Sequence, residues 1–454
     1  MSGGKVFFVS LGCDKNLTDS EKMLGLLYAD GYSVAASEEE ADVIVVNTCC
    51  FIGDAKEESI GAILEMSEYR REGRCRALIV TGCLAQRYRQ EIMDEIPEVD
   101  AVIGTTAFDS LGEVLDGVLK DAGAPHIVKL DDLGRLAHPK GRRMLTTGGH
   151  YAYLKIAEGC DKHCTYCVIP QVRGPYRSVP MEELLEEARR LGSEGVKELI
   201  LVAQETTLYG TDLYGEKSLH RLLEALCAIP EIRRIRILYC YPEEIYPEMV
   251  QVMKKEPKIC RYLDLPIQHC SDDILRRMGR KTDRESLEEI ISMLREEIPG
   301  IALRTTLITG FPGETPAQHE ELVDFIDRME FDRLGVFTYS QEEDTPAAEM
   351  PDQIPEEVKQ ERQEELMALQ QEISRDLNER KVGSVLTVMV EGKVSDEEDV
   401  WAARTEFDAP DVDGYVFIRT GEQLMSGDLA RVRITGAGDY DLTGVLEDED
   451  EYTE

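Results

Sequence analysis

Three closely spaced cysteines in the middle of the chain constrain its fold more than any other feature. Cys160, Cys164 and Cys167 follow the apolar, strand-like run 151–157 with the spacing C-x3-C-x2-C. A four-iron cluster usually takes four thiolates, so three thiolates leave one iron open for substrate chemistry. A zinc site would favour paired C-x2-C units, and no second unit follows. The spacing therefore predicts an iron–sulfur cluster on a loop at the end of a strand.

The region before this motif has the pattern of an open parallel α/β sheet. Apolar runs at 6–11, 43–46 and 78–80 predict buried strands, with helices at about 18–28 and 54–69 and a short strand at 101–103. Cys13, Cys49 and Cys83 each follow one of the three runs. Because the carboxyl ends of parallel strands meet at one sheet edge, these thiols should converge into a second cluster site. The alternative is three unrelated buried cysteines.

The middle of the chain predicts a partial (β/α)6 barrel. Strand-like runs at 151–157, 199–203, 235–239, 262–267, 303–309 and 334–338 alternate with helical segments, and active groups of such barrels lie at the carboxyl ends of the strands. Glycines there would let the backbone approach a ligand closely. The candidate cofactor-binding residues within or after these runs are Gln204, Glu205, Gln268, His269, Arg304, Gly310 and Gly313.

The last part of the chain predicts a charged helix at 356–380, followed by a small antiparallel β-barrel built from short alternating strands. Residues 381–454 contain 6 basic and 19 acidic residues, a net charge of −13, within a chain of net charge −39. This balance disfavours direct nucleic-acid binding through the acidic tail and suits a basic protein partner.

The chain has the composition of a cytoplasmic protein with reduced thiols. Twelve cysteines in 454 residues are too dilute for a disulfide scaffold. The first residues lack a signal-peptide pattern, and no apolar run approaches the roughly 20 residues of a membrane span, so no membrane partner is expected.

The C-x3-C-x2-C loop resembles that of the radical S-adenosylmethionine (SAM) enzymes. Together with Gly12-Cys13, Asn47-Thr48-Cys49 and Gly82-Cys83, it resembles the methylthiotransferase family over essentially the whole chain. The resemblance implies two 4Fe-4S clusters, SAM bound at the open iron, and hydrogen abstraction by a SAM-derived radical. It also implies that hydrogen bonding to SAM or substrate, rather than proton transfer, is the role of Glu205 and His269.

With this resemblance the chain divides into four parts. Residues 1–120 form a methylthiotransferase domain with the second cluster, 121–145 a linker, 146–375 a radical SAM domain, and 381–450 a TRAM-like substrate-binding β-barrel.

Two substrate classes occur in the family, a tRNA adenosine and a ribosomal protein. The stretches 10–16 (SLGCDKN) and 265–269 (LPIQH) are similar to the ribosomal-protein branch, although that branch usually has Asp where this chain has Glu205. This similarity implies modification of an aspartate β-carbon in ribosomal protein S12, free or on the 30S subunit, with an electron donor protein as a further partner.

Two alternatives stay open at this point: a tRNA adenosine methylthiotransferase, and a non-enzymatic iron–sulfur electron carrier or redox sensor. The electron carrier would not cleave SAM under a strong reductant.

Overall fold

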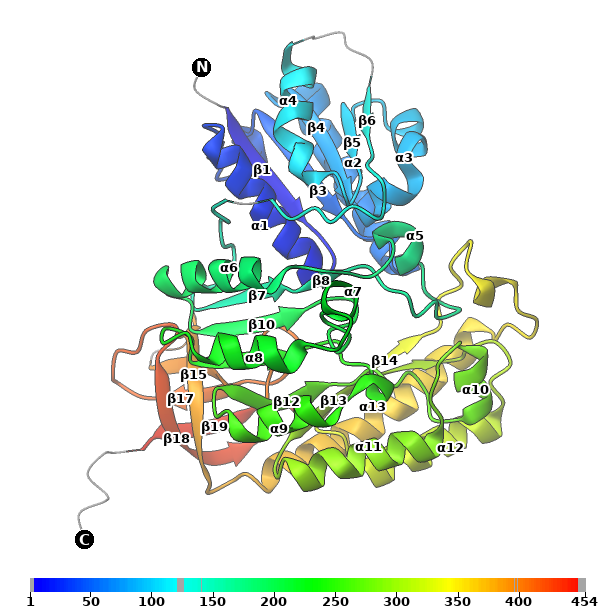
Figure 1. Ribbon diagram of the computed structural model, residues 1–454, viewed down its shortest axis with the longest axis vertical. Helices are drawn as coiled ribbons and strands as arrows, with labels where there is room; N and C mark the ends of the chain where they lie inside the picture. The colour runs from blue at the N-terminus through cyan, green and yellow to red at the C-terminus, as the bar shows by residue number, and fades with distance from the viewer. Residues whose placement is uncertain (1–3, 121–125, 140, 396, 398, 448–454) are drawn as a thin grey trace.

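The computed structural model describes residues 4–120, 126–139, 141–395, 397 and 399–447. Two parallel sheets, a closed barrel and a two-stranded pair make up its β-structure. Figure 1 shows the first sheet at the top, the second below it, and the barrel, in orange and red, beside the second sheet. The predicted fold class, two α/β regions followed by a small β-barrel, is confirmed.

The first sheet has the strand order β2-β1-β3-β4-β5-β6, and all its pairs are parallel. Its strands are β1 (Lys5–Ser10), β2 (Ser33–Val34), β3 (Val43–Thr48), β4 (Ala77–Gly82), β5 (Ala101–Ile103) and β6 (Ile127–Lys129). Its helices are α1 (Asp14–Ala29), α2 (Gly53–Glu72), α3 (Cys83–Glu95) and α4 (Leu111–Lys120). Every residue of β3 and β4 is buried, as continuous apolar runs in a parallel sheet require.

Two details of this region differ from expectation. Helix α1 begins at Asp14, directly after Cys13, and not near residue 18, because the polar residues 14–20 form its first turns and are themselves mostly buried. Strand β6 lies in the stretch interpreted as a linker, and it pairs with β5 as the edge strand of the sheet.

The second sheet has the parallel order β14-β13-β12-β11-β10-β7, as predicted for a partial barrel of six units. Its strands are β7 (Tyr151–Lys155), β10 (Glu198–Val202), β11 (Arg234–Ile237), β12 (Ile259–Asp264), β13 (Ala302–Thr309) and β14 (Arg333–Thr338), and β8 (Ala157–Glu158) and β9 (Arg177–Ser178) form the separate pair. The helices are α5 (Ile169–Arg173), α6 (Met181–Ser193), α7 (Thr211–Tyr214), α8 (Leu219–Cys227), α9 (Pro247–Lys255), α10 (Asp272–Arg277), α11 (Arg284–Glu297), α12 (Pro316–Met329) and α13 (Glu356–Glu379).

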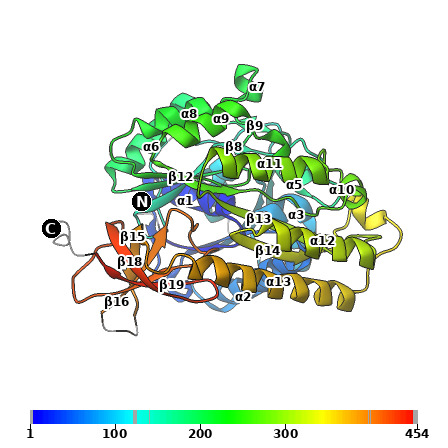
Figure 2. The same cartoon turned by 90° about the horizontal axis from the view of Figure 1, so that it is seen from below.

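The C-terminal barrel closes in the order β15-β16-β17-β19-β18. Its strands are β15 (Val385–Lys393), β16 (Val400–Thr405), β17 (Val416–Arg419), β18 (Leu429–Ala437) and β19 (Leu442–Leu446). Its pairs are antiparallel except for β17 with β19, which is parallel. Figure 2 shows the barrel next to α13, the helix that leads into it.

Candidate active site

The first cysteine triad lies where the sequence pattern placed it, after three adjacent strands. Cys13, Cys49 and Cys83 follow β1, β3 and β4, which are direct neighbours in the sheet. Packing there is tight, since a Cβ on Gly12, whose φ is +85°, would lie 2.7 Å from the Cβ of Cys49. Burial, together with the nearby Cys83 and Cys13, raises the pKa of the Cys49 thiol to about 12. The three thiols are therefore close neighbours.

The second triad lies on the loop between β8 and α5. Gly159 has φ +81°, and a Cβ there would overlap the carbonyl oxygen of Pro175, so the residue before Cys160 has to be glycine. The amide of Cys160 donates to Gly174 O at 3.1 Å, and that of Cys167 donates to Cys164 O at 3.0 Å. Burial raises the pKa of Cys160 to about 11 and that of Cys167 further. The loop thus holds three largely buried thiols in a fixed turn.

Both triads offer only thiol groups as ligands. Among the described residues, no three His, Cys, Asp or Glu side chains converge as ligands of one ion would. Because each cysteine of a four-iron cluster binds its own iron, the sulfurs need not converge on one point. A soft-ligand, all-thiol donor set is also the one that iron–sulfur clusters use.

The two triads belong to facing edges of the two sheets. Asp14, next to Cys13, accepts a hydrogen bond at 3.3 Å from the hydroxyl of Tyr239, at the end of the third strand of the second region. The ammonium group of Lys15 lies 3.1 Å from the centre of the same ring. The edge that carries the first triad therefore packs against the strand ends of the second sheet.

Gln204 and Glu205 follow β10, and their environments differ. Gln204 accepts from the amide of Gly159 at 2.8 Å and donates to Glu158 at 2.7 Å, so it holds the cysteine loop in place. Glu205 is fully buried, and one of its oxygens, Oε2, has no hydrogen-bond partner among the described residues. Burial raises its pKa to about 7, although Thr207 and Lys162 oppose the shift. Glu205 thus offers an acceptor, or a proton, to a ligand at the strand ends.

Gln268 and His269 follow β12. Gln268 adopts a left-handed backbone conformation, φ +71°, and bridges to Leu307 of β13. His269 is fully buried, its Nδ1 accepts from the amide of Ser271 at 2.9 Å, and its Nε2 has no partner among the described residues. Burial, with His319 and Arg362 nearby, lowers the pKa of His269 to about 3, so the ring is neutral.

Gly310, Gly313 and Arg304 have a structural environment that the sequence did not reveal. Gly310 and Gly313 have φ +70° and +76°, so the left-handed backbone already explains both glycines, and a Cβ at Gly310 would also overlap Lys359. Arg304 donates to Asp264 at 2.9 Å and lies 3.5 Å from Asp413 of the C-terminal domain. Arg304 therefore contacts the C-terminal domain, apart from the cysteine loop.

Sequence reasoning missed two arginines near the cysteines. Arg280 is buried and stacks on the ring of Tyr241 with its guanidinium 4.3 Å from the ring centre, and the Tyr241 hydroxyl lies 3.9 Å from Cys164 Sγ. Arg173 donates through Nε to Cys83 Sγ at 3.3 Å. Neither arginine follows a predicted strand or belongs to a recognisable motif, so only their spatial neighbours identify them.

The acidic C-terminal domain uses much of its charge internally. Asp408 pairs with Arg333 at 2.5 Å, Asp413 accepts from the Tyr262 hydroxyl at 2.8 Å, and Glu391 pairs with Arg404 at 2.6 Å. Asp408 and Asp413 thereby join the C-terminal domain to the second sheet, whereas the pair Glu391–Arg404 lies within the barrel. Of the acidic residues 396–399, Glu397 and Asp399 are exposed, and Asp396 and Glu398 lie outside the described residues. The surface available to a basic partner is therefore less acidic than the residue count suggests.

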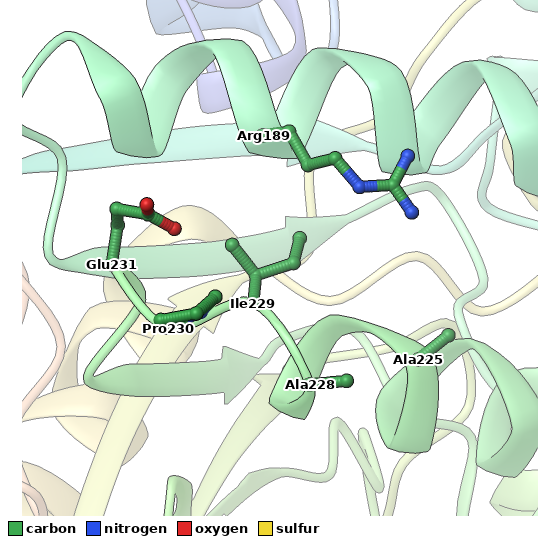
Figure 3. A pocket seen from close by; sticks show the side chains of 6 residues that line it. All are labelled: Arg189, Ala225, Ala228, Ile229, Pro230 and Glu231. Atoms are coloured by element: carbon green, nitrogen blue, oxygen red, sulfur yellow. The ribbon is translucent and has the colours of Figure 1, made fainter.

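A pocket of about 320 Å³ lies on the side of the second region near α6 and α8, away from the strand ends (Figure 3). None of the predicted site residues lines it; its lining residues are Arg189, Ala225, Ala228, Ile229, Pro230 and Glu231. In the described part of the chain, no helix combines the length and apolar character that crossing a bilayer requires.

Family models match three parts of the chain. Residues 5–104 match "Uncharacterized protein family UPF0004", residues 154–326 the "Radical SAM superfamily", and residues 382–446 the "TRAM domain". Among solved structures, the radical SAM methyltransferase TsrM from Kitasatospora setae has a TM-score of 0.56 at 14% identity, covering 85% of this chain and 80% of that one. The cobalamin-dependent radical enzyme OxsB has a TM-score of 0.52 at 15% identity, covering 81% of this chain and 56% of that one. These two neighbours support the fold alone.

Curated relatives are far closer. A protein named ribosomal protein uS12 methylthiotransferase RimO, from Lachnoclostridium phytofermentans, is 60% identical over 98% of this chain and 100% of its own length. The protein of the same name from Clostridioides difficile is 47% identical over 97% of this chain and 98% of its own length. With such identity along nearly its whole length, the chain belongs to the RimO family of radical SAM methylthiotransferases.

Proposed function

We propose that this enzyme adds a methylthio group to the β-carbon of an aspartate in ribosomal protein uS12. Membership of the RimO family implies 4Fe-4S clusters and SAM as its cofactors. The observation that carries the proposal is the pair of cysteine triads on facing sheet edges, because sulfur insertion at an unreactive carbon needs both a radical generator and a place to hold sulfur.

In this proposal each triad holds one cluster. Cys160, Cys164 and Cys167 would hold the cluster whose open iron binds SAM, and that pair would supply one-electron cleavage of SAM. Cys13, Cys49 and Cys83 would hold the cluster that handles sulfur. The buried acceptor Glu205 Oε2 and the neutral ring of His269 would orient SAM or substrate by hydrogen bonds.

The remaining candidates have supporting roles. Gln204 would position the cysteine loop through Gly159, Gln268 would shape the strand-end loop, and Gly310 and Gly313 would allow the turns after β13. Arg304 would hold the C-terminal domain through Asp413. We assign residues 1–120 to sulfur handling, 146–375 to SAM chemistry and 381–450 to substrate binding, with an electron donor protein supplying the reductant.

The test combines cluster content with product analysis. Anaerobic reconstitution should give about eight irons per chain, and replacing Cys160, Cys164 and Cys167 by Ala should leave about half. Cys49→Ala should cleave SAM but form no methylthiolated product. Cys164→Ala should neither cleave SAM nor form the product.

Cys75 provides a matched control, since it is buried and belongs to neither triad; its Sγ donates to Ala77 O at 3.2 Å. Cys75→Ala should keep full iron and full activity. Mass spectrometry of uS12 and of tRNA nucleosides, from cells with and without the gene, separates the substrates. A modified tRNA adenosine with unmodified uS12 would refute the proposed substrate.

A further inference from the structure

Arg173, at the end of α5, lies between the two cysteine triads. Its side chain is among the largest fully buried ones in the described chain. All three of its guanidinium nitrogens have partners, which come from both domains. Burying the charge of an arginine costs free energy, and a complete set of partners fixes the orientation of its guanidinium group. Such a residue therefore points to a specific role.

Toward the first domain, Arg173 reaches the loops of the first triad. Nε donates to Cys83 Sγ at 3.3 Å, and Nη2 donates to the side-chain oxygen of Asn16. Asn16 in turn donates to Leu11 O at 3.0 Å and to Thr48 O at 2.9 Å. These two carbonyls belong to the turns that carry Cys13 and Cys49. One arginine therefore contacts one ligand directly and holds the backbone near the other two.

Toward the second domain, Arg173 reaches the loop of the second triad. Nη1 pairs with Glu158 at 3.1 Å, and it also pairs with Asp19 of α1, in the first domain, at 2.8 Å. Glu158 also accepts from Lys155 at 2.6 Å and from Gln204 at 2.7 Å, and Gln204 accepts from Gly159, next to Cys160. Two cations and two carboxylates thus balance in a buried network between the triads.

We infer that Arg173 is a positioning residue that sets the reduction potential of the first-domain cluster. The inference rests on the proposed function, which places a cluster on Cys13, Cys49 and Cys83. Hydrogen bonds to the cysteine sulfurs, and nearby charge, are among the factors that set iron–sulfur potentials. An N–H donor with a positive charge stabilises the more negative, reduced cluster. Arg173 therefore raises the potential of this cluster.

The experiment uses the full chain with Cys160, Cys164 and Cys167 replaced by Ala, which leaves one cluster to observe. Arg173→Met and Arg173→Lys are added to this parent, and the midpoint potential and iron content are measured by EPR-monitored redox titration and iron analysis. We expect a shift to more negative potential for Arg173→Met. The shift should be smaller for Arg173→Lys, which keeps the charge but loses the planar fork.

Arg236→Met is the matched control. Arg236 is equally buried and pairs with Glu198 at 2.9 Å, but it contacts no residue of either triad. The midpoint potential of the cluster in Arg236→Met should equal that in the parent. If Arg173→Met loses its cluster, the potential of Arg173→Lys decides, since a value more negative than that of the parent supports the inference and an equal value overturns it. An unchanged potential at full iron in Arg173→Met, or equal cluster loss in Arg236→Met, would overturn it. A parent without iron would instead refute the proposed first-domain cluster.

Discussion

Replacing Glu198 by glutamine should release the C-terminal barrel from the second sheet. Glu198 is the first residue of β10 and is fully buried. Its carboxylate pairs with Arg236 of β11 at 2.9 Å and with Arg404 of the barrel strand β16 at 2.9 Å. Both arginines are fully buried as well. The pair Glu198–Arg404 therefore joins residues 206 positions apart across the domain contact.

The size of the effect follows from the charge environment of Glu198. Burial alone would raise its pKa, but Arg404, Arg236 and Arg234 outweigh burial and lower the pKa from 4.5 to about 2. At about 1.4 kcal/mol per pKa unit, the lowering corresponds to about 3 kcal/mol of stability. Glutamine would also leave the buried Arg236 without a carboxylate, while Arg404 would keep only Glu391, and breaking a buried pair costs about 3–5 kcal/mol. We expect a loss of about 3–5 kcal/mol at pH 7.

The sign of the pH dependence is defined by the lowered pKa. The stabilisation is present in full above the unfolded pKa near 4.5, and it is lost as the pH falls through about 2. The difference in the free energy of unfolding between the native protein and Glu198→Gln should therefore become smaller as the pH falls below 4.5.

Trp401 makes the assay specific for the barrel. It is the single tryptophan of the chain, is 7% exposed, and lies on the same strand as Arg404. Urea unfolding followed by its fluorescence should show a midpoint lowered by about 1–5 M, for a slope of about 1–3 kcal/mol per molar urea. Glu406→Gln is the control, because its partner Arg261 is 50% exposed and such pairs contribute at most about 1 kcal/mol. A midpoint for Glu198→Gln no lower than that of Glu406→Gln would refute this reasoning.

Three further predictions concern the site and the domain contacts. Because the pKa of Glu205 in the folded protein is about 7, the free energy of unfolding should fall as the pH rises from 4.5 through 7. Thermal unfolding of Glu205→Gln at several pH values should no longer show this fall. A pH profile equal to that of the native protein would contradict the prediction. Gly82 has φ +93°, and a Cβ there would overlap Asn47 and Thr48, so Gly82→Ala should lower the free energy of unfolding by more than about 1 kcal/mol and reduce the iron bound by the first domain. Iron analysis checks this against Gly61→Ala, whose Cβ would meet nothing within 4 Å. Glu342→Gln removes the carboxylate that pairs with both Lys56 and Arg87 and should loosen the contact between the first and second domains. Faster amide hydrogen exchange in α2 would show this loosening, and equal exchange rates would count against that contact.

Local patterns in the sequence were enough to predict the framework of the fold. The strands β3, β4 and β5 were predicted because a strand buried on both faces needs a continuous apolar run, and β1 was predicted from its own apolar run although most of its residues are only partly buried. The positions of the six candidate cysteines follow from the same reasoning, since each comes directly after a predicted strand or within a tight loop. The short edge strands β2 and β6 were missed, because edge strands are partly exposed and have no such run.

Long-range contacts were decided by the tertiary structure alone. Arg173 meets Cys83 and Asn16, 90 and 157 positions away, and no spacing rule connects them. The acidic C-terminal residues Asp408, Asp413 and Glu391 meet cationic or hydroxyl partners instead of solvent, which charge counting along the chain cannot show. The physical reason is that ligand spacing and strand burial are encoded by neighbours in sequence, whereas a buried ion pair is encoded only by where two distant segments pack.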